Sequence, residues 1–324
     1  MVLAAGLGER MRPLTLVRAK PVLPVLNRPL LQWTLARLAQ QGVTEAVVNL
    51  HYLPATVRRA LGNGRALGLR IRYSQEGEIL GTGGGPRKVR RFFDDGPFVI
   101  VNGDVLFDFD LRALVREHRR SGALATLALR RNPDPRRYGG AVLDRGAWVR
   151  AIAGRPVPRR GHPWLFTGVH VLDPALLARL PAGRSDSVRD LYIPLLAEGG
   201  RIRGVALEGA WYDFGSPALY LSSHMSLLSS GFRAVRPRAK LVHPSARVAR
   251  GAVVERSVIG AGCVIGSGAR IQGSVLWDDV QVGAESRVRG SIVASGARLA
   301  PGTVVRDTVV VPLTDGTLRT AVQG

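Results

Sequence analysis

The second half of the chain repeats an aliphatic residue at steps of six, six and five positions. Every fourth such position lies seventeen residues beyond its equivalent, and each is Val, Ile or Leu: Val242, Val248, Val254, Ile259, Ile265, Ile271, Leu276, Val282, Val288, Val293, Leu299 and Val305. A small or β-branched residue follows four positions after each of them. Such a hexapeptide period makes three short faces per coil. The pattern predicts four coils of a left-handed parallel β-helix between Val242 and Val309.

The predicted coils stack with their aliphatic residues inward, because one coil alone cannot bury its apolar face. A β-sandwich is the alternative for a run of short strands. Sandwich strands alternate with a period of two and are irregularly spaced, so they do not keep an unbroken seventeen-residue register. We therefore expect a β-helix domain at 241–312, followed by a C-terminal tail at 313–324.

Residues 1–230 have a different pattern, in which short apolar runs alternate with helical stretches. The runs typical of strands are 46–50, 69–73, 98–101 and 124–129, and the helical stretches are 29–41, 54–61 and 111–121. This alternation predicts an α/β domain with a Rossmann-like, mostly parallel sheet. The carboxyl ends of its strands are the expected ligand edge. A linker at 231–240 joins the two predicted domains.

A glycine-rich turn follows the apolar start of the chain. The segment from Ala5 to Gly8 cannot continue a strand, so we expect the backbone to turn there and to expose its amides to phosphate oxygens. Arg10, Arg12 and Lys20 follow within fifteen residues. This density of positive charge suits a triphosphate, because Arg binds phosphate through two parallel hydrogen bonds and Lys supplies a compact point charge.

An ordinary strand-to-helix turn with solvated basic residues is the alternative. The turn is neither a Walker loop nor a dinucleotide fingerprint, because no Lys-Ser/Thr pair closes it and no third glycine stands at the Rossmann spacing. The whole run from Gly6 to Thr15, completed by Lys20-Pro21, resembles the opening motif of the sugar-1-phosphate nucleotidyltransferases. That motif is Gly-x-Gly-x-Arg-Leu/Met-x-Pro-Leu-Thr followed by Pro-Lys-Pro, and Ala19 stands in place of the first proline of the triplet.

The resemblance implies a role for each residue of this motif. Arg10 and Lys20 are the implied catalytic residues, which clamp the triphosphate. The residues implied to line the nucleotide here are Ala4, Ala5, Gly6 and Gly8.

Two aspartates are candidate metal ligands. Asn102-Gly103-Asp104 directly follows the apolar run 98–101, so the Asp104 carboxylate stands at a strand's carboxyl end, where it can hold Mg²⁺ or simply form a turn. The run from Trp211 to Pro217 resembles the family's Trp-x-Asp-Ile/Phe-Gly-Thr/Ser-Pro segment. The resemblance implies that Asp104 and Asp213 hold one Mg²⁺ ion, with Asn102 and Gly103 beside the nucleotide.

A second glycine-rich segment runs from Glu76 to Gly85 and is interpreted as a loop that a ligand approaches closely. In the resembled family this segment lies against the nucleobase, which implies contacts from Glu76, Gly81 and Thr82. The triple glycine at its end differs from the commoner Gly-Thr-Ala-Gly and is similar to the branch that makes UDP-N-acetylmuramate. The base therefore stays open.

The sugar phosphate has four implied contacts: Gly139, Arg155, Thr167 and Gly168. As isolated tripeptides, the segments at 138–140 and 166–168 are ordinary turns and strand ends, and only their position in the motif order supports this role. Gly154-Arg155-Pro156 stands where many members have Glu-Lys-Pro, so Arg155 replaces the lysine that meets the sugar phosphate. The missing carboxylate leaves the identity of the sugar open.

The implied reaction is nucleotidyl transfer from a nucleoside triphosphate to a sugar 1-phosphate, which releases pyrophosphate. GTP with mannose 1-phosphate is the preferred pair, because Glu-x-x-Leu-Gly-Thr, Asn-Gly-Asp and a C-terminal β-helix occur together in that branch. UTP or dTTP with N-acetylmuramate, N-acetylglucosamine or glucose 1-phosphate fits the same motifs.

Two other functions compete with this one. The family includes catalytically silent regulatory members, but those lose motif residues that this chain retains. A β-helical acyltransferase relies on a histidine between coils, and His243 is the only histidine in the repeat. We therefore expect the β-helix to support oligomerisation, most simply into a homo-oligomer, or to support a lid.

Composition excludes several partners. The chain has 46 basic and 24 acidic residues, which give a net charge of +22. Only three of the basic residues are lysines: Lys20, Lys88 and Lys240. The arginines are spread along the chain, so we expect attraction to anions but no specific nucleic-acid partner. Cys263 is the single cysteine, which excludes an internal disulfide and favours the cytoplasm. No membrane span or signal peptide is expected, and the clipped first strand suggests a native start upstream of Met1.

Overall fold

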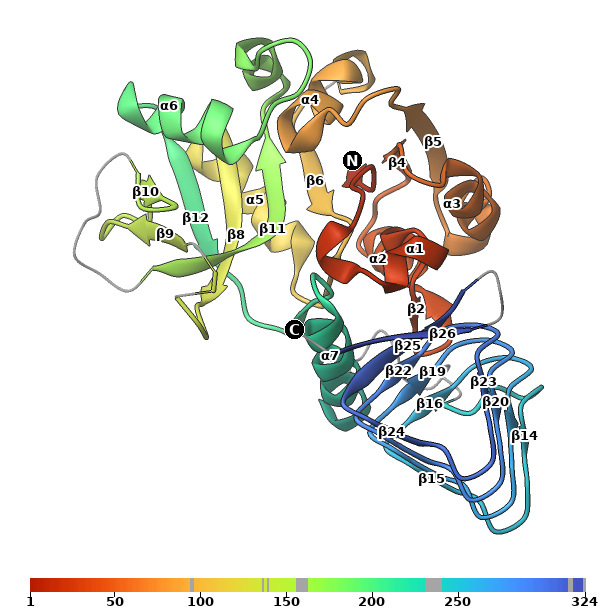
Figure 1. Cartoon of the computed structure of the whole chain (residues 1–324). Coiled ribbons are helices and arrows are strands. Elements are labelled where there is room, and N and C mark those ends of the chain that lie inside the picture. The colour runs from red at the N-terminus through yellow and green to blue at the C-terminus, as the bar shows by residue number, and fades with distance from the viewer. Residues whose placement is uncertain are drawn as a thin grey trace. The chain divides into compact units, whose positions relative to one another are not determined.

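The computed structural model describes residues 1–93, 96–135, 137–138, 140–155, 163–230, 241–313 and 317–322 (Figure 1). The chain forms two compact units. Unit 1 comprises residues 1–6 and 34–211, and unit 2 comprises residues 7–33 and 212–324. The segment that carries Arg10 and Lys20 therefore belongs to the same unit as the C-terminal repeats. The domain boundaries expected from the sequence stay predictions, and the linker lies outside the described residues.

Unit 1 is built on a nine-stranded sheet of order β10-β9-β11-β6-β1-β4-β5, in which β8 pairs with β11 and β12. Its strands are β1 (Val2–Leu3), β4 (Glu45–Leu50), β5 (Arg70–Gln75), β6 (Phe98–Asn102), β8 (Ala125–Arg131), β9 (Gly140–Leu143), β10 (Val149–Ile152), β11 (Trp164–Leu172) and β12 (Ile202–Ala206). Strands β5, β4, β1 and β6 are parallel, and β11 runs antiparallel to β6. The predicted Rossmann-like α/β sheet is confirmed.

Helices α2, α3 and α5 lie close to where the sequence predicts them, whereas residues 81–85, interpreted from the sequence as part of a loop, form the start of helix α4. The α-helices are α1 (Leu14–Val17), α2 (Leu30–Gln40), α3 (Pro54–Leu61), α4 (Gly81–Lys88), α5 (Leu111–Ser121), α6 (Ile193–Ala197) and α7 (Pro217–Ser230). The shorter helical turns are η1 (Glu9–Met11), η2 (Lys20–Val22), η3 (Arg65–Leu67), η4 (Arg90–Phe92), η5 (Pro174–Arg179) and the π-helical η6 (Val188–Tyr192). Asp110 caps α5 by accepting a hydrogen bond from the Arg112 amide, which fixes where that helix begins. Two short strands complete the list for this part of the chain: β7 (Val105–Phe107) and β13 (Trp211–Asp213).

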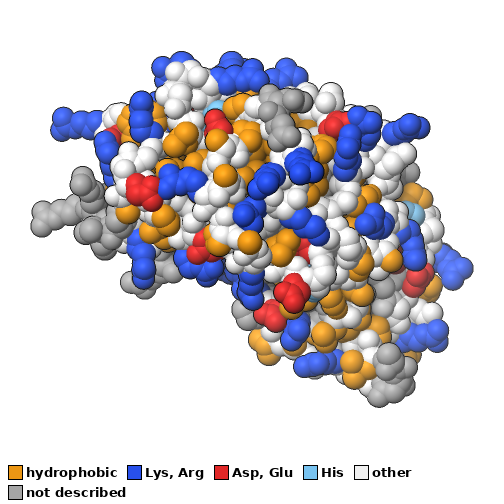
Figure 2. All heavy atoms as spheres, turned by 90° about the horizontal axis from the view of Figure 1, so that it is seen from above, with side chains coloured by type: hydrophobic (Ala, Val, Ile, Leu, Met, Phe, Trp, Pro, Cys, Tyr) orange, Lys and Arg blue, Asp and Glu red, His pale blue; other side chains and the backbone are white. Residues whose placement is uncertain are grey.

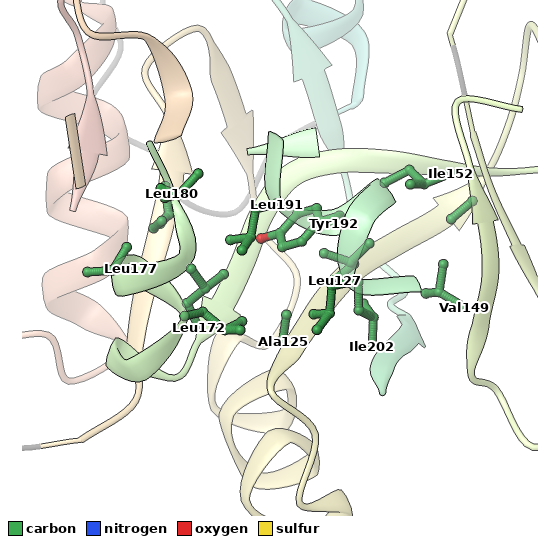
Figure 3. Packing of buried hydrophobic residues seen from close by; sticks show 14 of the residues in the cluster. Ala125, Leu127, Val149, Ile152, Leu172, Leu177, Leu180, Leu191, Tyr192 and Ile202 are labelled. Carbon is green, nitrogen blue, oxygen red and sulfur yellow. The ribbon is translucent and has the colours of Figure 1, made fainter. Parts of the chain in front are cut away.

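The core of unit 1 fills the space beneath η5, η6 and α6. Figure 3 shows Leu127 and Leu172 from neighbouring strands beside Tyr192 from η6. The Tyr192 hydroxyl lies 3.0 Å from His170 Nδ1, which is also buried. Burial lowers the pKa of His170 to about 3, so the imidazole is neutral in this core.

Unit 2 contains the predicted β-helix, a stack of three parallel sheets. The first holds β14 (Arg247–Val248), β17 (Val264–Ile265), β20 (Gln281–Val282) and β23 (Arg298–Leu299), and the second holds β15 (Val253–Glu255), β18 (Arg270–Gln272), β21 (Arg287–Arg289) and β24 (Val304–Arg306). The third holds β16 (Val258–Ile259), β19 (Val275–Leu276), β22 (Ile292–Val293), β25 (Thr308–Pro312) and the antiparallel β26 (Leu318–Val322). Partners such as Ile271 and Val288 are seventeen residues apart, which confirms the predicted register.

Two sets of side chains stabilise the stack. The predicted inward positions from Ile259 onward form one buried cluster, whereas Val242 and Val248 of the first coil are 38% and 40% exposed because no coil precedes theirs. A hydroxyl ladder follows the turns before the third sheet. There the amides of Ser274, Ser291 and Thr308 each donate to the hydroxyl seventeen positions earlier, at 3.0–3.2 Å, so that the ladder begins at the Ser257 hydroxyl.

Unit 2 also holds the strands β2 (Pro24–Val25) and β3 (Arg28–Pro29), which form a hairpin that follows η2. Leu26 and Asn27 make its turn with φ values of 48° and 62°. Two residues with positive φ are typical of the tightest hairpin connections. No helix in the described part of the chain is long and apolar enough to cross a membrane.

We expect Val282→Ala to lower the free energy of unfolding of the β-helix by about 2 kcal/mol, because the inward side chain of Val282 is 3% exposed and its loss leaves a cavity. Val248→Ala removes the same atoms from the equivalent position of the first coil and should cost less than about 1 kcal/mol. Urea unfolding followed by circular dichroism measures both. Equal losses would contradict the stacked register.

Candidate functional site

The signature loop, residues 7–23, closes around Gly8. The Gly8 carbonyl accepts hydrogen bonds from the Met11 amide at 2.9 Å and from Thr15 Oγ1 at 2.8 Å. Gly8 has a φ of 67°, and a Cβ there would lie 2.8 Å from Thr15 Cγ2 and 3.3 Å from Lys20 Cβ. Only glycine fits this close approach in this conformation. The fold thus brings three predicted motif residues, Gly8, Thr15 and Lys20, into contact.

The entrance to this loop leaves its backbone amides unpaired. Among the described residues, no acceptor takes a hydrogen bond from the five successive amides of residues 6–10. A Cβ on Gly6 would meet no atom within 4 Å, and its φ is not in the left-handed region. The Arg10 side chain is exposed and has no partner within the described part of the chain. Consecutive free backbone amides beside an arginine suit the binding of an anion.

The carboxyl ends of the parallel strands bring several predicted residues to one edge of unit 1. Leu3 of β1 pairs in register with Asn102 of β6, and the Gly103 amide donates to the Leu3 carbonyl at 2.9 Å. Ala4 and Ala5 follow β1 and are buried, whereas Asp104 follows β6 and is half-buried. The alternation of strands and helices therefore places the Asn102–Asp104 turn next to the start of the glycine-rich turn.

Glu76 is held by an internal network rather than left open. Its Oε1 accepts from Asn49 Nδ2 at 2.8 Å, its Oε2 accepts from the Leu80 amide at 3.0 Å, and the side chain is buried. Asn49 Oδ1 accepts from the Ala4 amide at 2.7 Å. The network joins the ends of β1 and β4 to the glycine-rich segment. Asn49 was missed from the sequence, although a polar residue inside the apolar run 46–50 is a usable signal.

The glycines after Thr82 approach protein, not open space. A Cβ on Gly84 would overlap the Gly183 carbonyl oxygen, and one on Gly83 would lie 2.9 Å from Ser185 Oγ. The Thr82 hydroxyl donates to Asp186 Oδ2 at 2.9 Å and accepts from the Ser187 amide at 2.8 Å. The segment 183–187 therefore packs on Gly81 and the start of α4, and no local pattern in the sequence indicates this contact.

The two predicted sugar contacts on β11 lie in a bulge. The register between β11 and β8 shifts between Phe166 and His170, and Thr167 Oγ1 donates to the Ala128 carbonyl at 2.9 Å. Gly168 has a φ of 76°, and a Cβ there would lie 2.6 Å from Asn102 Nδ2. The bulge thus brings Gly168 against Asn102, so a predicted sugar residue touches a predicted nucleotide residue. Bulges commonly re-aim residues next to active sites.

The remaining sugar-phosphate residues are less constrained. Arg155 follows β10 and pairs with Ile152 through backbone hydrogen bonds of 2.8 and 3.0 Å. Its exposed guanidinium has no partner in the described ranges, so the structure does not join it to Thr167 or Gly168. Gly139 lies outside the described residues.

Asp213 ends β13 in a tight turn. Its backbone carbonyl accepts from Ser223 Oγ of α7 at 2.9 Å, and a Cβ on Gly215 would lie 2.8 Å from Asp213 Oδ1. The glycine in the Asp-Phe-Gly run therefore makes room for the carboxylate. Asp104 belongs to unit 1 and Asp213 to unit 2, and their convergence on one ion stays a prediction. The described residues hold no cluster of three or more His, Cys, Asp or Glu side chains that would bind a metal.

Basic side chains are dispersed on the surface. Figure 2 shows Lys and Arg scattered over the visible face among apolar and neutral side chains, not gathered into one band. Nucleic-acid-binding proteins typically collect their positive charge on one face or along one helix. The absence of a specific nucleic-acid partner stays a prediction.

Comparison with known proteins identifies two matching families. Residues 1–230 match the family described as Nucleotidyl transferase, and residues 220–314 match the EIF2B subunit epsilon LbH domain. A mannose-1-phosphate guanylyltransferase of Mycobacterium tuberculosis is 35% identical over 278 residues, which cover 82% of this chain and 76% of that protein. A UTP–glucose-1-phosphate uridylyltransferase of Synechocystis is 31% identical over 251 residues, which cover 73% of this chain and 65% of that protein.

Solved structures share the fold of the larger part of the chain. HddC from Yersinia pseudotuberculosis superposes with a TM-score of 0.60 at 21% identity, covering 70% of this chain and 97% of that one. A putative glucose-1-phosphate thymidylyltransferase from Bacillus anthracis gives a TM-score of 0.61 at 23% identity, covering 69% and 92%. At these identities the likeness concerns the fold alone.

We expect Asn49→Ala to lower the free energy of unfolding by about 2 to 3 kcal/mol, because it leaves the buried Ala4 amide and Glu76 Oε1 without their partner. Asn63→Ala is the matched control and should cost less than about 1 kcal/mol, since the exposed Asn63 side chain accepts from the Arg65 amide alone among the described residues. Chemical denaturation measures both variants. A loss at Asn49 no larger than at Asn63 would show that the network does not hold this edge of the sheet.

Proposed function

The chain belongs to the nucleotidyl transferase family, and we propose that it transfers a nucleotidyl group from GTP to mannose 1-phosphate, giving GDP-mannose and pyrophosphate. The choice of substrates is supported by the names of relatives, which include mannose-1-phosphate guanylyltransferases of M. tuberculosis and, as probable enzymes, of rice. The Synechocystis relative is named for UTP and glucose 1-phosphate, so that pair and its dTTP counterpart are the alternatives.

One observation carries the nucleotide part of this proposal: the five unpaired amides of residues 6–10 beside exposed Arg10 and open Gly6. Backbone amides in a folded protein normally find an acceptor or water. Successive free amides in a glycine turn suit the oxygens of a triphosphate, and Arg10 adds a bidentate donor. Neither the packing nor the backbone conformation of Gly6 requires glycine, whereas a phosphate that approaches the backbone does.

The reaction needs positioning and charge stabilisation rather than a protein nucleophile. A phosphate oxygen of the sugar 1-phosphate attacks the α-phosphorus, and the bond from that phosphorus to the oxygen of the leaving pyrophosphate breaks. The nucleophile is already ionised at neutral pH, so the site must hold two repelling anions together and neutralise the charge on the leaving group. Arg10 and Lys20 do so at the triphosphate, and Arg155 holds the sugar phosphate.

A divalent cation suits this chemistry, and Mg²⁺ is the ion we propose. Asp104 and Asp213 would hold it, because both offer hard carboxylate oxygens and Gly215 leaves room beside Asp213 Oδ1. Phosphate oxygens and water would complete the ligand set. When bound, the ion neutralises charge on the reacting phosphates.

The other predicted contacts take narrower roles. The side chains of Glu76 and Thr82 are engaged inside the protein, so we propose that they shape the nucleobase pocket by holding Gly81 and its neighbours in place. Asn102 and Gly103 would line the nucleotide, and Gly139, Thr167 and Gly168 would line the sugar. A homo-oligomer formed through the β-helix and a cytoplasmic location remain part of the proposal.

The first experiment incubates the purified chain with Mg²⁺ and four nucleoside triphosphates against mannose, glucose, N-acetylglucosamine and N-acetylmuramate 1-phosphates. We expect pyrophosphate release and a product mass of GDP-mannose from one pair, and loss of both when EDTA replaces Mg²⁺. If a different single pair gave product, only the proposed substrates would change. If no pair gave product while the chain still bound nucleotide sugars, a regulatory function would replace the proposal.

Gly6→Ala tests the open turn. The variant should keep the melting temperature of the wild type, because the added methyl group meets no protein atom, yet lower the affinity for the triphosphate roughly 10- to 100-fold. Gly8→Ala should instead lower the melting temperature, since its methyl group would collide with Thr15. Calorimetric titration and thermal unfolding separate the two effects. Unchanged triphosphate affinity in Gly6→Ala would place the phosphates elsewhere.

A further inference from the structure

The three outer faces of the β-helix are not equivalent. Most outward positions of the second sheet are exposed, among them Arg270, Arg287 and Arg289. The outward positions of the third sheet are apolar and at most 1% exposed: Val258, Val275, Ile292 and Val309. Within unit 2, α1 of the signature loop contacts strand β25 of this third sheet.

Arg18 links the signature loop to the turn after β19. Its Nη2 atom lies 3.2 Å from Asp278 Oδ2 and 3.2 Å from Ser295 Oγ. Its guanidinium also stands 5.3 Å from the centroid of the Trp277 ring, at cation–π distance. Arg18 is only two residues before Lys20, so this contact fixes the backbone that carries a proposed triphosphate ligand.

A second contact holds the chain just after Lys20. Trp277 Nε1 donates to the Tyr220 hydroxyl at 3.0 Å, and that hydroxyl donates to the Pro24 carbonyl. Trp277 and Tyr220 are both fully buried, so these bonds form away from water. Trp277 of the β-helix thus contacts Arg18, two residues before Lys20, and, through Tyr220, the start of the hairpin that follows Lys20.

The hairpin turn is the third point of attachment. Asn27 Nδ2 donates to the Ile259 carbonyl at 2.9 Å, and the Leu26 amide donates to His224 Nε2 at 3.3 Å. Burial lowers the pKa of His224 to about 4, which keeps the ring neutral and able to accept this bond. Its Nδ1 lies 2.8 Å from the Tyr220 carbonyl. Contacts within unit 2 therefore hold the segment 18–27 at Arg18, at Pro24 and at the Leu26–Asn27 turn.

We propose that the β-helix is a positioning element of the triphosphate site and that Arg18 is the positioning residue through which it orients Lys20. The inference rests on the proposed role of Lys20 in binding the triphosphate. A displacement of about 1 Å in a catalytic group can lower the rate about 10²-fold. Loss of a contact two residues away from Lys20 can therefore lower turnover strongly. An exposed ion pair with no such role would contribute little to stability and nothing to kinetics.

The test compares Arg18→Ala, Asp278→Asn and their double variant with wild type in the full chain. Asp278→Asn keeps an acceptor for the Ala261 amide and so perturbs the β-helix least. We expect kcat to fall roughly 10- to 100-fold, or KM for the triphosphate to rise as much, while KM for the sugar 1-phosphate stays constant. The double variant should be no worse than Arg18→Ala, because both changes break one contact. Arg18→Lys should recover part of the loss.

Arg298→Ala is the matched control, since this exposed arginine lies on the first sheet, away from the loop contacts. It should leave all kinetic constants unchanged. Equal effects of Arg298→Ala and Arg18→Ala, or wild-type kinetics in Arg18→Ala, would overturn the inference.

Amide hydrogen exchange keeps the inference distinct from the proposed function. If the wild type turned over no substrate pair, the proposed function would fail. Faster exchange of the amides of residues 19, 20, 22 and 23 in Arg18→Ala than in wild type would still support the anchoring, and equal exchange would overturn it.

Discussion

The parallel register of the β-helix is the constraint on which much of this structure depends. Stacking at seventeen-residue intervals places equivalent residues above one another, so a difference between faces extends over the full length of the stack. One face becomes a continuous apolar surface, and the turn after β19 presents Trp277 and Asp278 beside it. The signature loop and the hairpin that follows it are fastened to these groups. The β-helix thereby determines where Arg18 and its neighbours lie.

Periodic features of the chain were predictable, and long-range polar contacts were not. The inward positions of the β-helix and the bounds of α3 and α5 follow from local periodicity, which needs no knowledge of the rest of the fold. The Asn49–Glu76 bond, the packing of 183–187 on α4 and the Arg18–Asp278 pair join residues between 27 and 260 positions apart. Asn49 stands out as a polar residue inside an apolar run, but nothing in the local sequence indicates its partner Glu76. The other residues are ordinary in their own segments, so the local sequence does not mark them at all.

Glycines illustrate the same limit. Gly6, Gly8 and Gly84 all stand in motifs that the sequence interprets as places of close ligand approach. In the structure Gly8 packs on Thr15 and Lys20, Gly84 packs on the Gly183 carbonyl, and only Gly6 faces open space. A glycine in a motif therefore indicates a close approach to the backbone, but the local sequence does not distinguish approach by another part of the protein from approach by a ligand.

The central claim is that one side of the signature loop is built in advance by unit 2, whereas the other side is left open for phosphate. Amide hydrogen exchange of the wild-type chain, with and without triphosphate and Mg²⁺, tests it most directly. We expect slow exchange of the amides of residues 22, 23 and 26 in both states, because these amides already donate hydrogen bonds within unit 2. We expect the amides of residues 6–10 to exchange fast in the chain without triphosphate and to be protected when the triphosphate binds. Fast exchange of the amides of residues 22, 23 and 26, or no protection of residues 6–10 by the triphosphate, would contradict the central claim.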